Sequence, residues 1–384
     1  MSVPLCLGLM ALASWLYLLM GRGLFWLVRE RDEVSPPPPA CWPSVVAVVP
    51  ARDEADMIAR SVGSLLGQDY PGSFRVILVD DGSSDGTARA ARLEAEARGA
   101  ATRLDILAGA PLPSGWTGKI WAQHQGIAVA AEAKPDYLLL TDADIHHAPD
   151  NLRALVARAE QGGLAMTSLM ALLCCGNRAE RFLIPAFVFF FQMLYPFAWV
   201  ADRSARTAAA AGGCMLVRRN ALEAAGGIAA IRGEIIDDCA LGRALKRQGP
   251  VWLGLTRRAR SLRPYNSVAD IGRMIARSAY AQLGYSPLLL AGTLLGMGLA
   301  YLAPPLLALL VEGWAAWLGA AAWAAMAVAF QPMLRFYRVS PLWGLALPAI
   351  GAAYGLFTLQ SAWQVWRGRG GMWKGRFQAM AGRA

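Results

Sequence analysis

The sequence predicts an α/β domain of the doubly wound type, joined to hydrophobic helices long enough to cross a membrane. Apolar or β-branched runs at residues 44–49, 75–79 and 137–140 each end in an acidic loop, and helical patterns separate them. Composition supports the membrane part, because 56% of the 384 residues are hydrophobic and only 17% are charged. Soluble domains are typically about 45–50% apolar, so a membrane protein is the natural class.

The basic residues lie beside apolar stretches instead of forming one long run. Lysine and arginine exceed aspartate and glutamate by 37 − 27 = 10, and many gather at residues 22–31, 257–277 and 367–383. This distribution is typical of cytoplasmic flanks that face anionic lipid, and it does not indicate a nucleic-acid partner. The six cysteines form no Cys-x-x-Cys pair, which favours a reducing compartment without a disulfide framework or zinc site.

The first apolar stretch, residues 3–20, carries no charge and is followed by three arginines. Because it lacks a basic start and a small-residue cleavage site, we expect a retained transmembrane anchor within residues 1–30. The following arginines indicate that its C-terminal side faces the cytoplasm. Residues 31–43 contain SPPPPACWP and predict a stiff linker, after which we expect the α/β domain over residues 44–280.

The strand predicted at residues 137–140 is followed by Asp142 and Asp144. Residues i and i+2 of a strand point the same way, so both carboxylates are expected on one face at the strand's C-terminal end. Open α/β sheets bind ligands there. Two hard oxygen donors suit Mg2+ or Mn2+, and these ions suit a diphosphate. Taken alone, however, the same pattern occurs in ordinary turns and helix caps.

A second acidic loop follows the strand predicted at residues 75–79. Asp80 and Asp81 can accept hydrogen bonds from a base or ribose, and Gly82 allows close approach of the backbone. An Asx-rich turn with a helix cap would also explain this loop, but it explains the doubled aspartate less well. Lys119 follows a glycine-rich turn at a predicted helix start, where it either meets a phosphate or is an ordinary solvated lysine.

Two later segments contain small and acidic residues that are further candidates for the site. Gly212 and Gly213 lead into a predicted strand and leave room for a substrate to approach the backbone. Asp237 and Asp238 open a predicted helix. Capping and the helix dipole would explain these two carboxylates, and so would a general base beside a reacting sugar.

The aromatic segment at residues 181–201 is interrupted by Pro185 and Pro196. A complete span here would put Asp238 on the side of the membrane opposite Asp142. We therefore favour an interfacial or re-entrant element, and a core helix of the α/β domain is the alternative.

Residues 286–366 contain three further candidate spans, at 287–311, 314–334 and 341–363. If all three cross the membrane, the basic tail at residues 367–384 lies opposite the α/β domain and violates the positive-inside rule. The sequence therefore leaves two alternatives, either two or three C-terminal crossings, with a re-entrant segment in the first case.

Six motifs occur in the order found in family 2 inverting glycosyltransferases, which this sequence resembles over residues 44–278. The motifs are PARDEAD, VDDGSSDGT, GKIWAQHQG, TDADI, GGCMLVRRNALEAAGG and DDCAL. The N-terminal anchor, the aromatic segment and the C-terminal spans resemble the hopanoid-associated, ceramide-glucosyltransferase-like branch. The resemblance implies a GT-A fold, which is a Rossmann-like nucleotide-diphospho-sugar transferase domain.

The resemblance also implies roles for the matching residues. Asp80 and Asp81 would hold uracil and ribose. Asp142 and Asp144 would hold the donor diphosphate through Mg2+ or Mn2+. The other positions expected to bind the nucleotide-sugar are Pro50, Arg52, Glu54, Lys119, Gly212, Gly213, Asp237, Arg273 and Arg277.

The same resemblance makes Asp238 the catalytic base, with Asp237 at a position where the family usually has glutamate. Many membrane relatives carry Gln-x-x-Arg-Trp downstream. Here Met274 stands at the glutamine position, and Ser278 follows Arg277. The two arginines of this stretch would still neutralise the departing diphosphate.

The sequence thus predicts a multi-pass glycosyltransferase of the cytoplasmic membrane, with its catalytic domain facing the cytoplasm. It would transfer a sugar from a UDP-sugar to a lipid hydroxyl, in a hopanoid or related lipid. Polyprenyl phosphate is the alternative acceptor. A non-catalytic membrane scaffold or lipid-transport partner is an alternative of another class, but the retention of Asp142, Asp144 and Asp238 argues against it.

Overall fold

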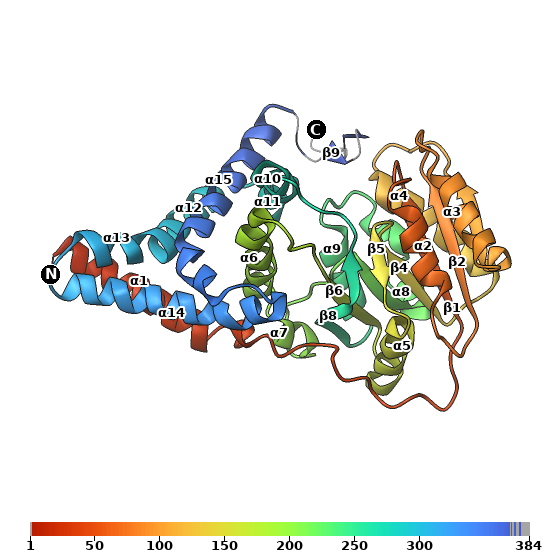
Figure 1. Ribbon diagram of the computed structural model, residues 1–384, viewed down its shortest axis with the longest axis horizontal. Coiled ribbons are helices and arrows are strands. Elements are labelled where there is room, and N and C mark those ends of the chain that lie inside the picture. The colour runs from red at the N-terminus through yellow and green to blue at the C-terminus, as the bar shows by residue number, and fades with distance from the viewer. Residues whose placement is uncertain (1, 369, 371, 374–375, 378–384) are drawn as a thin grey trace. The chain divides into compact units, whose positions relative to one another are not determined.

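The computed structural model describes residues 2–368, 370, 372–373 and 376–377, and the chain forms two compact units (Figure 1). We name them the α/β unit and the helical unit. The α/β unit comprises Glu30–Cys174 and Trp199–Arg263, together with the short strands β9 (Met372–Trp373) and β10 (Arg376–Phe377). The helical unit comprises the chain before residue 30, Cys175–Ala198, and the chain from residue 264 to residue 370. Most of the basic tail expected at residues 367–384 lies outside the described residues.

An eight-stranded mixed sheet forms the centre of the α/β unit, in the order β3-β2-β1-β4-β7-β6-β8-β5. Strands β3, β2, β1 and β4 are parallel, whereas β7 pairs antiparallel with β4 and β6. β8 runs parallel to β6, and β5 pairs antiparallel with β8. The strands are β1 (Val45–Ala51), β2 (Phe74–Asp80), β3 (Leu104–Ala108), β4 (Tyr137–Thr141), β5 (Ile145–His147), β6 (Met166–Leu172), β7 (Cys214–Arg218) and β8 (Val251–Ser261).

Helices cover both faces of this sheet. Val45 and Val49 of β1 belong to a buried core shared with helices α2, α3 and α5. On the other face, α4 lies so close to β1 that a Cβ atom on Gly126 would be 2.5 Å from Val48. Successive residues of β1 therefore point into opposite layers, as in a doubly wound sheet. The helices are α2 (Ile58–Leu66), α3 (Thr87–Ala97), α4 (Gly118–Glu132), α5 (Asn151–Gly162), α8 (Arg219–Ala224) and α9 (Asp237–Lys246).

The start of the expected linker is bound to the sheet. Arg31 forms a β-bridge with Leu255 of β8. The Asp32 carboxylate is buried, lies 3.2 Å from the Arg258 guanidinium and accepts a hydrogen bond from Thr256 at 2.9 Å. A buried carboxylate needs such partners, so this pairing fixes where the chain enters the α/β unit. Residues 31–32 are thus part of the folded α/β unit and are bound along strand β8.

The helical unit consists of helices and short 3-10 or π-helical turns. Among the described residues, four segments are long and apolar enough to cross a membrane: Val3–Met20, Pro287–Leu310, Trp314–Tyr337 and Pro341–Trp366. One N-terminal and three C-terminal candidates match the prediction. The helices are α1 (Val3–Met20), α6 (Arg178–Leu194), α10 (Val268–Ala276), α11 (Ala279–Gln282), α12 (Pro287–Met297), α13 (Ala303–Leu310), α14 (Trp314–Tyr337) and α15 (Leu347–Trp366); α7 (Phe197–Ala201) follows α6.

Small residues let these helices pack closely. A Cβ atom on Gly319 of α14 would lie 2.7 Å from the Leu307 Cβ of α13. The buried indole of Trp15 in α1 donates a hydrogen bond to the Ala300 carbonyl at 2.8 Å. Four residues after Ala300 the chain has Pro304, which has no N–H to offer that carbonyl. Trp15 therefore satisfies a backbone acceptor that a lipid environment would leave unpaired.

The aromatic segment expected at residues 181–201 is mostly α6. Its Phe189 contacts Phe25 and Phe330, and its Leu183 carbonyl accepts a hydrogen bond from Tyr354 at 2.9 Å. These partners all belong to the helical unit, so α6 belongs there too and is not a core helix of the sheet domain. Figure 1 shows α6 and α15 running crosswise to α1 and α14 within this unit.

Candidate functional site

Polar side chains converge at one end of the sheet in the α/β unit. The C-terminal ends of the parallel strands β1, β2 and β4 meet there, as in other open α/β sheets. The start of α4, the start of α9 and the chain after β8 supply further side chains that contact these ends. Every contact described below for this site lies within the α/β unit.

Lys119, at the start of α4, connects the acidic residues of the site. Its Nζ lies 2.8 Å from Asp142 Oδ1 and 3.2 Å from Asp237 Oδ2. Burial alone lowers the pKa of a lysine, but the Asp142 and Asp237 carboxylates raise the pKa of Lys119 above its usual value. Lys119 is therefore a charged, largely buried residue of the cluster and not a solvated surface lysine.

Asp238 lies in the first turn of α9 and is held by two backbone N–H groups. Its Oδ2 accepts a hydrogen bond from Gly212 N at 3.0 Å, and its Oδ1 accepts one from Cys239 N at 2.7 Å. Burial and the adjacent Asp237 charge raise the pKa of Asp238 to about 6, although Lys119 opposes the shift. A carboxylate with a pKa near neutrality is suited to take a proton from a substrate.

Gly212 and Gly213 have different surroundings. A Cβ atom on Gly212 would lie 3.0 Å from Lys119 Nζ and 3.5 Å from Asp238 Oδ2, so a side chain would crowd both groups. A Cβ atom on Gly213 would instead lie 3.2 Å from Ile145 Cδ1. The absence of a side chain at Gly212 thus allows the cluster itself to pack, which the sequence argument about substrate approach did not anticipate.

Asp142 and Asp144 lie in the turn between β4 and β5, not in a strand. Strand alternation does not govern a turn, so the predicted placement of both carboxylates on one strand face is wrong. Asp142 pairs with Lys119, whereas Asp144 Oδ2 accepts a hydrogen bond from Arg263 Nε at 2.9 Å. Burial raises the pKa of Asp142, Lys119 lowers it, and the charge of Asp144 raises it again. The two carboxylates thus still act on each other electrostatically.

Arg263 is the residue of this site that sequence reasoning missed. It follows β8, and its guanidinium bonds both Asp144 and Glu54, so it joins the β4–β5 turn to the end of β1. Glu54 is buried, with 7% of its surface exposed. In the sequence, Arg263 is one of several arginines between residues 257 and 277, which we interpreted as a membrane flank.

The loops after β1 and β2 are tied together by hydrogen bonds. Backbone N–H groups of the loop after β1 donate to side chains of the loop after β2 and of the first residue of α3. The bonds are Asp53 N to Ser83 Oγ at 3.0 Å, Ala55 N to Asp85 Oδ2 at 2.9 Å and Glu54 N to Thr87 Oγ1 at 2.8 Å. Arg52 donates to the Asp81 carbonyl and lies 3.8 Å from its carboxylate. The turn and cap interpretation accounts for Asp85, which also accepts a hydrogen bond from Thr87 N.

The remaining predicted residues lie in different places. Asp81 is buried, whereas Asp80 is partly exposed and accepts a hydrogen bond from Ser83 N at 2.9 Å. Pro50 is inside β1. Arg273, in α10, and Arg277, directly after it, belong to the helical unit, so their contact with a diphosphate stays a prediction.

The carboxylate pair suits a divalent cation only if other groups complete the coordination. Among the described residues, no three His, Cys, Asp or Glu side chains are grouped so that they could hold a metal ion. Asp142 and Asp144 offer oxygen donors, which Mg2+ and Mn2+ prefer, and such ions commonly take their other ligands from phosphates and water. The donor set therefore fits an ion that binds together with a diphosphate.

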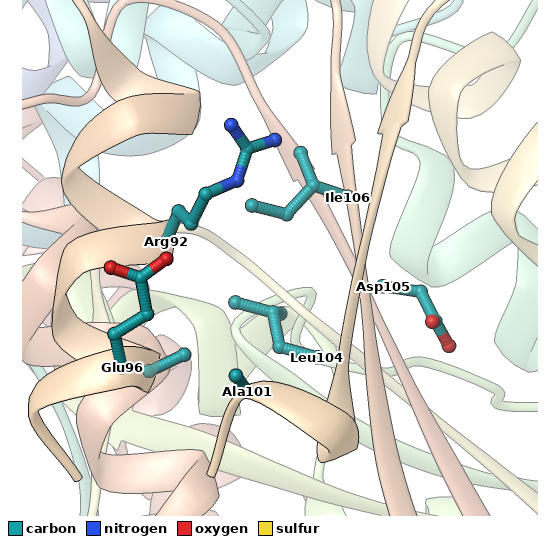
Figure 2. A pocket seen from close by; sticks show the side chains of 7 residues that line it. Arg92, Glu96, Ala101, Leu104, Asp105 and Ile106 are labelled. Carbon is teal, nitrogen blue, oxygen red and sulfur yellow. The ribbon is translucent and has the colours of Figure 1, made fainter. Parts of the chain in front are cut away.

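A cavity of about 340 Å³ lies away from this cluster, at the edge strand β3 (Figure 2). Figure 2 shows Leu104 and Ile106 pointing toward α3, which contributes Arg92 and Glu96, while Asp105 points to the other side. None of the predicted site residues lines this cavity. We assign it no role in the chemistry.

The mixed α/β fold is of the GT-A type, and comparison with known families shows that the chain is a glycosyltransferase. The family model named Glycosyl transferase family group 2 matches residues 137–356, and the one named Glycosyl transferase family 2 matches residues 46–226. The first match covers more than half of the 384 residues. The chain belongs to Glycosyl transferase family group 2.

Curated relatives are similar over part of the chain. An N-acetylglucosaminyltransferase of Mesorhizobium japonicum is 31% identical over 194 residues, which are 49% of this chain and 42% of the relative. An undecaprenyl-phosphate 4-deoxy-4-formamido-L-arabinose transferase of Klebsiella pneumoniae is 28% identical over 125 residues, 31% of this chain and 34% of that relative. The matched region spans less than half the length of either protein.

A solved structure is similar over nearly the whole chain. It is a mannosyltransferase from Pyrobaculum calidifontis in complex with GDP-Man and Mn2+, with a TM-score of 0.53 and 20% sequence identity. The alignment covers 93% of this chain and 99% of the mannosyltransferase. At this identity the likeness shows the fold alone, and it confirms the predicted GT-A class.

Proposed function

We propose that this glycosyltransferase is a membrane-bound, inverting hexosyltransferase that moves a sugar from a UDP-sugar to a hydroxyl group of a lipid. The observation that carries the proposal is the environment of Asp238. Two backbone N–H groups fix its carboxylate, and its pKa is raised to about 6. A hydroxyl acceptor needs such a base, because it must lose its proton as it attacks.

The proposed reaction is a single displacement at the anomeric carbon of the sugar. The acceptor oxygen forms a bond to that carbon while the bond to the diphosphate oxygen breaks on the opposite face, which inverts the configuration. The acceptor proton passes to Asp238, and the nucleoside diphosphate leaves. Lys119 holds a positive charge between Asp142 and Asp237, and this charge offsets the repulsion among the acidic groups.

Asp142 and Asp144 would hold Mg2+ or Mn2+ in this proposal. The ion supplies charge stabilisation for the leaving diphosphate. Arg263 fixes the Asp144 carboxylate, and Lys119 fixes that of Asp142. The presence of Mn2+ in the similar mannosyltransferase structure supports the choice of ion.

The loops after β1 and β2 would bind the nucleoside. Asp80 and Asp81 would accept hydrogen bonds from uracil and ribose, beside Pro50, Arg52 and Glu54. The uridine part of the proposal depends on the resemblance of these motifs, and a donor panel must also contain GDP-sugars because the mannosyltransferase was solved with GDP-Man.

Membrane location supports a lipid acceptor. Four apolar helices among the described residues suit a membrane protein, and the Klebsiella pneumoniae relative is named for undecaprenyl phosphate. We propose the cytoplasmic membrane, with the α/β unit facing the cytoplasm, and a hopanoid or related lipid alcohol as the first acceptor class to test. The diphosphate would also meet Arg273 and Arg277.

Polyprenyl phosphate is the second candidate acceptor, favoured by the name of that same relative. A phosphate oxygen is already ionised at neutral pH, so it scarcely needs a base. Asp238 therefore separates the two candidates: a hydroxyl acceptor requires its carboxylate, whereas a phosphate acceptor does not.

The test is sugar transfer by the full chain purified in detergent. Radiolabelled UDP- and GDP-sugars are offered with a hopanoid alcohol, polyprenyl phosphate or total membrane lipid, with and without Mn2+. We expect a lipid-linked product that requires Mn2+, and a loss of at least about 100-fold in turnover for Asp238→Asn with donor binding retained. The exposed, remote Asp105→Asn is the matched control.

Three outcomes would change the proposal. Near-normal activity of Asp238→Asn toward polyprenyl phosphate would favour the phosphate acceptor. Equal loss of donor binding in Asp238→Asn and Asp144→Ala would contradict the separate roles of base and metal site. Absence of both binding and transfer with every donor would leave the scaffold alternative.

A further inference from the structure

His147 of β5 is a buried histidine that the proposed reaction does not use. Only 1% of its surface is exposed, and both ring nitrogens have partners. Nε2 lies 3.0 Å from Thr141 Oγ1, and Nδ1 lies 2.9 Å from Asn151 Nδ2. The backbone N of His147 also donates to Ser64 Oγ at 3.0 Å, which anchors the strand to α2.

The hydrogen bonds of Thr141 determine which ring nitrogen carries the proton. Thr141 Oγ1 donates to the Gly213 carbonyl at 2.7 Å. A carbonyl oxygen only accepts, and a hydroxyl has one hydrogen to give, so that hydrogen is committed to Gly213. His147 must therefore donate its Nε2–H to Thr141 Oγ1.

The contact of the other ring nitrogen, Nδ1, is consistent with a proton on Nε2. With its proton on Nε2, the ring presents the Nδ1 lone pair to the Asn151 amide, which can donate one hydrogen there and one toward Cys214 Sγ at 3.8 Å. Burial, and then the neighbouring His146, lower the pKa of His147 to about 3. The ring is therefore neutral at physiological pH, as an Nδ1 acceptor requires.

This chain of hydrogen bonds ends beside both candidate carboxylate sites. Thr141 is the last residue of β4 and directly precedes Asp142. Gly213 directly follows Gly212, whose N–H binds the Asp238 carboxylate. The bond from Thr141 to Gly213 thus connects the chain at the proposed diphosphate site to the chain at the proposed base.

We propose that His147 is a positioning residue for the transfer reaction: through its Nε2–H it commits the Thr141 hydroxyl to Gly213 and thereby fixes the spacing between Asp142 and Asp238. The inference rests on the proposed roles of these two carboxylates. The donor diphosphate and the acceptor hydroxyl must meet at one sugar carbon, and a misplacement of about 1 Å can cost about 100-fold in rate. A group that sets their spacing therefore acts on turnover more than on binding.

Substitutions of Thr141 test the link with little change of volume. We expect Thr141→Val to lower kcat by about 10- to 100-fold and to change the donor KM by less than about threefold, because binding of the donor does not need the base. Thr141→Ser keeps the hydroxyl and should restore kcat to within about threefold. Thr167→Val is the matched control, since Thr167 is also buried in the sheet and its hydroxyl has no hydrogen-bond partner among the described residues.

The protonation of His147 gives a readout that does not need catalysis. The chain contains three histidines, so ¹⁵N-histidine labelling with His147→Gln as the assignment variant identifies its signals. We expect a neutral ring with the proton on Nε2 that does not titrate between pH 5 and pH 8. This spectrum tests the hydrogen-bond network independently of catalysis. It therefore remains informative if no donor supports transfer and the proposed function fails.

Several results would overturn the inference. They are a proton on Nδ1, titration within that pH range, unchanged kcat in Thr141→Val, or an equal loss in Thr141→Ser or Thr167→Val. If Thr141→Val does not fold, the activity of Thr141→Ser and the spectrum of the unsubstituted protein still test whether His147 positions Thr141.

Discussion

Asp238 sits among charges that act on its pKa in opposite directions. Burial and Asp237 raise the pKa to about 6, and Lys119 works against them. A base must be deprotonated to act, so kcat/KM should fall as the pH drops through about 6 and reach a tenfold loss per pH unit below it. The check is a pH profile of kcat/KM between pH 4.5 and pH 8.

Substitution of Asp237 tests the origin of this fall in kcat/KM at low pH, which is the acid limb of the pH profile. Asp237→Asn removes a negative charge that favours protonation of Asp238, so the limb should move to lower pH even if overall activity falls. An unchanged limb in Asp237→Asn, or a limb below pH 5 in the unsubstituted protein, would contradict the assignment of Asp238 as the base.

Lys119 and the two aspartates show how far single residues could be predicted. The motif order pointed to Asp142 and Asp144, whose roles stay a prediction, and their location in a turn makes the predicted strand spacing wrong. For Lys119, the sequence allowed both a solvated side chain and a phosphate ligand. Only the folded chain brings α4 against the start of α9, which buries the lysine between Asp142 and Asp237.

At the scale of elements, Arg263 fastens three segments of the α/β unit. It joins the end of β1, the β4–β5 turn and the chain after β8 through Glu54 and Asp144. Removal of one member of a largely buried ion pair leaves the other charge without compensation. Because Arg263 is partly exposed, we expect Arg263→Gln to lower the free energy of unfolding by about 1–3 kcal/mol.

Thermal unfolding at low and high salt measures this effect. The comparison is Arg75→Gln, because Arg75 forms an exposed ion pair with Asp105 on β3 and should contribute about 1 kcal/mol or less. The loss from Arg263→Gln should exceed that from Arg75→Gln and persist in salt. Equal losses from the two substitutions would mean that Arg263 contributes no more than a surface pair.

The position of Arg263 could not be predicted, because the strand that precedes it, β8, could not be recognised. Uninterrupted apolar runs correctly indicated β1, β2 and β4. In β8, however, Arg257, Arg258 and Arg260 hide the apolar alternation, and in β6 Thr167 and Ser168 do the same. These strands form because they pair with each other and with β5 and β7, which is tertiary information absent from a local pattern.

At the scale of the whole molecule, hydropathy predicted which helices can cross a membrane but not how they are oriented. The four candidate spans match the expected apolar stretches. Orientation depends on packing: α15 contacts the ring of Tyr301 through Gly351 and packs with Phe357 against Gly272 of α10. Such contacts come from segments far apart in the sequence.

The crosswise direction of α15 allows a topology in which the basic tail obeys the positive-inside rule. If α1, the α12–α13 pair and α14 cross the bilayer, then α15, crosswise to α1 and α14 in Figure 1, lies along its surface. Two of its exposed apolar side chains, Trp363 and Trp366, are of the type enriched at membrane–water interfaces. Three crossings would then put the α/β unit and the chain after α15 on the same, cytoplasmic side, as the positive-inside rule requires.

Labelling with a membrane-impermeant maleimide tests this three-crossing topology. In a background with the other cysteines replaced, Glu312→Cys, between α13 and α14, should react in intact spheroplasts. Arg338→Cys, after α14, and Arg367→Cys, after α15, should react only in inverted vesicles. A separate variant that retains only the exposed native Cys41 of the α/β unit should react in the same way. Because α15 alone separates residues 338 and 367 among the candidate spans, reaction of Arg367→Cys in spheroplasts would show that α15 crosses the membrane. The tail would then face away from the α/β unit, as an exception to the positive-inside rule.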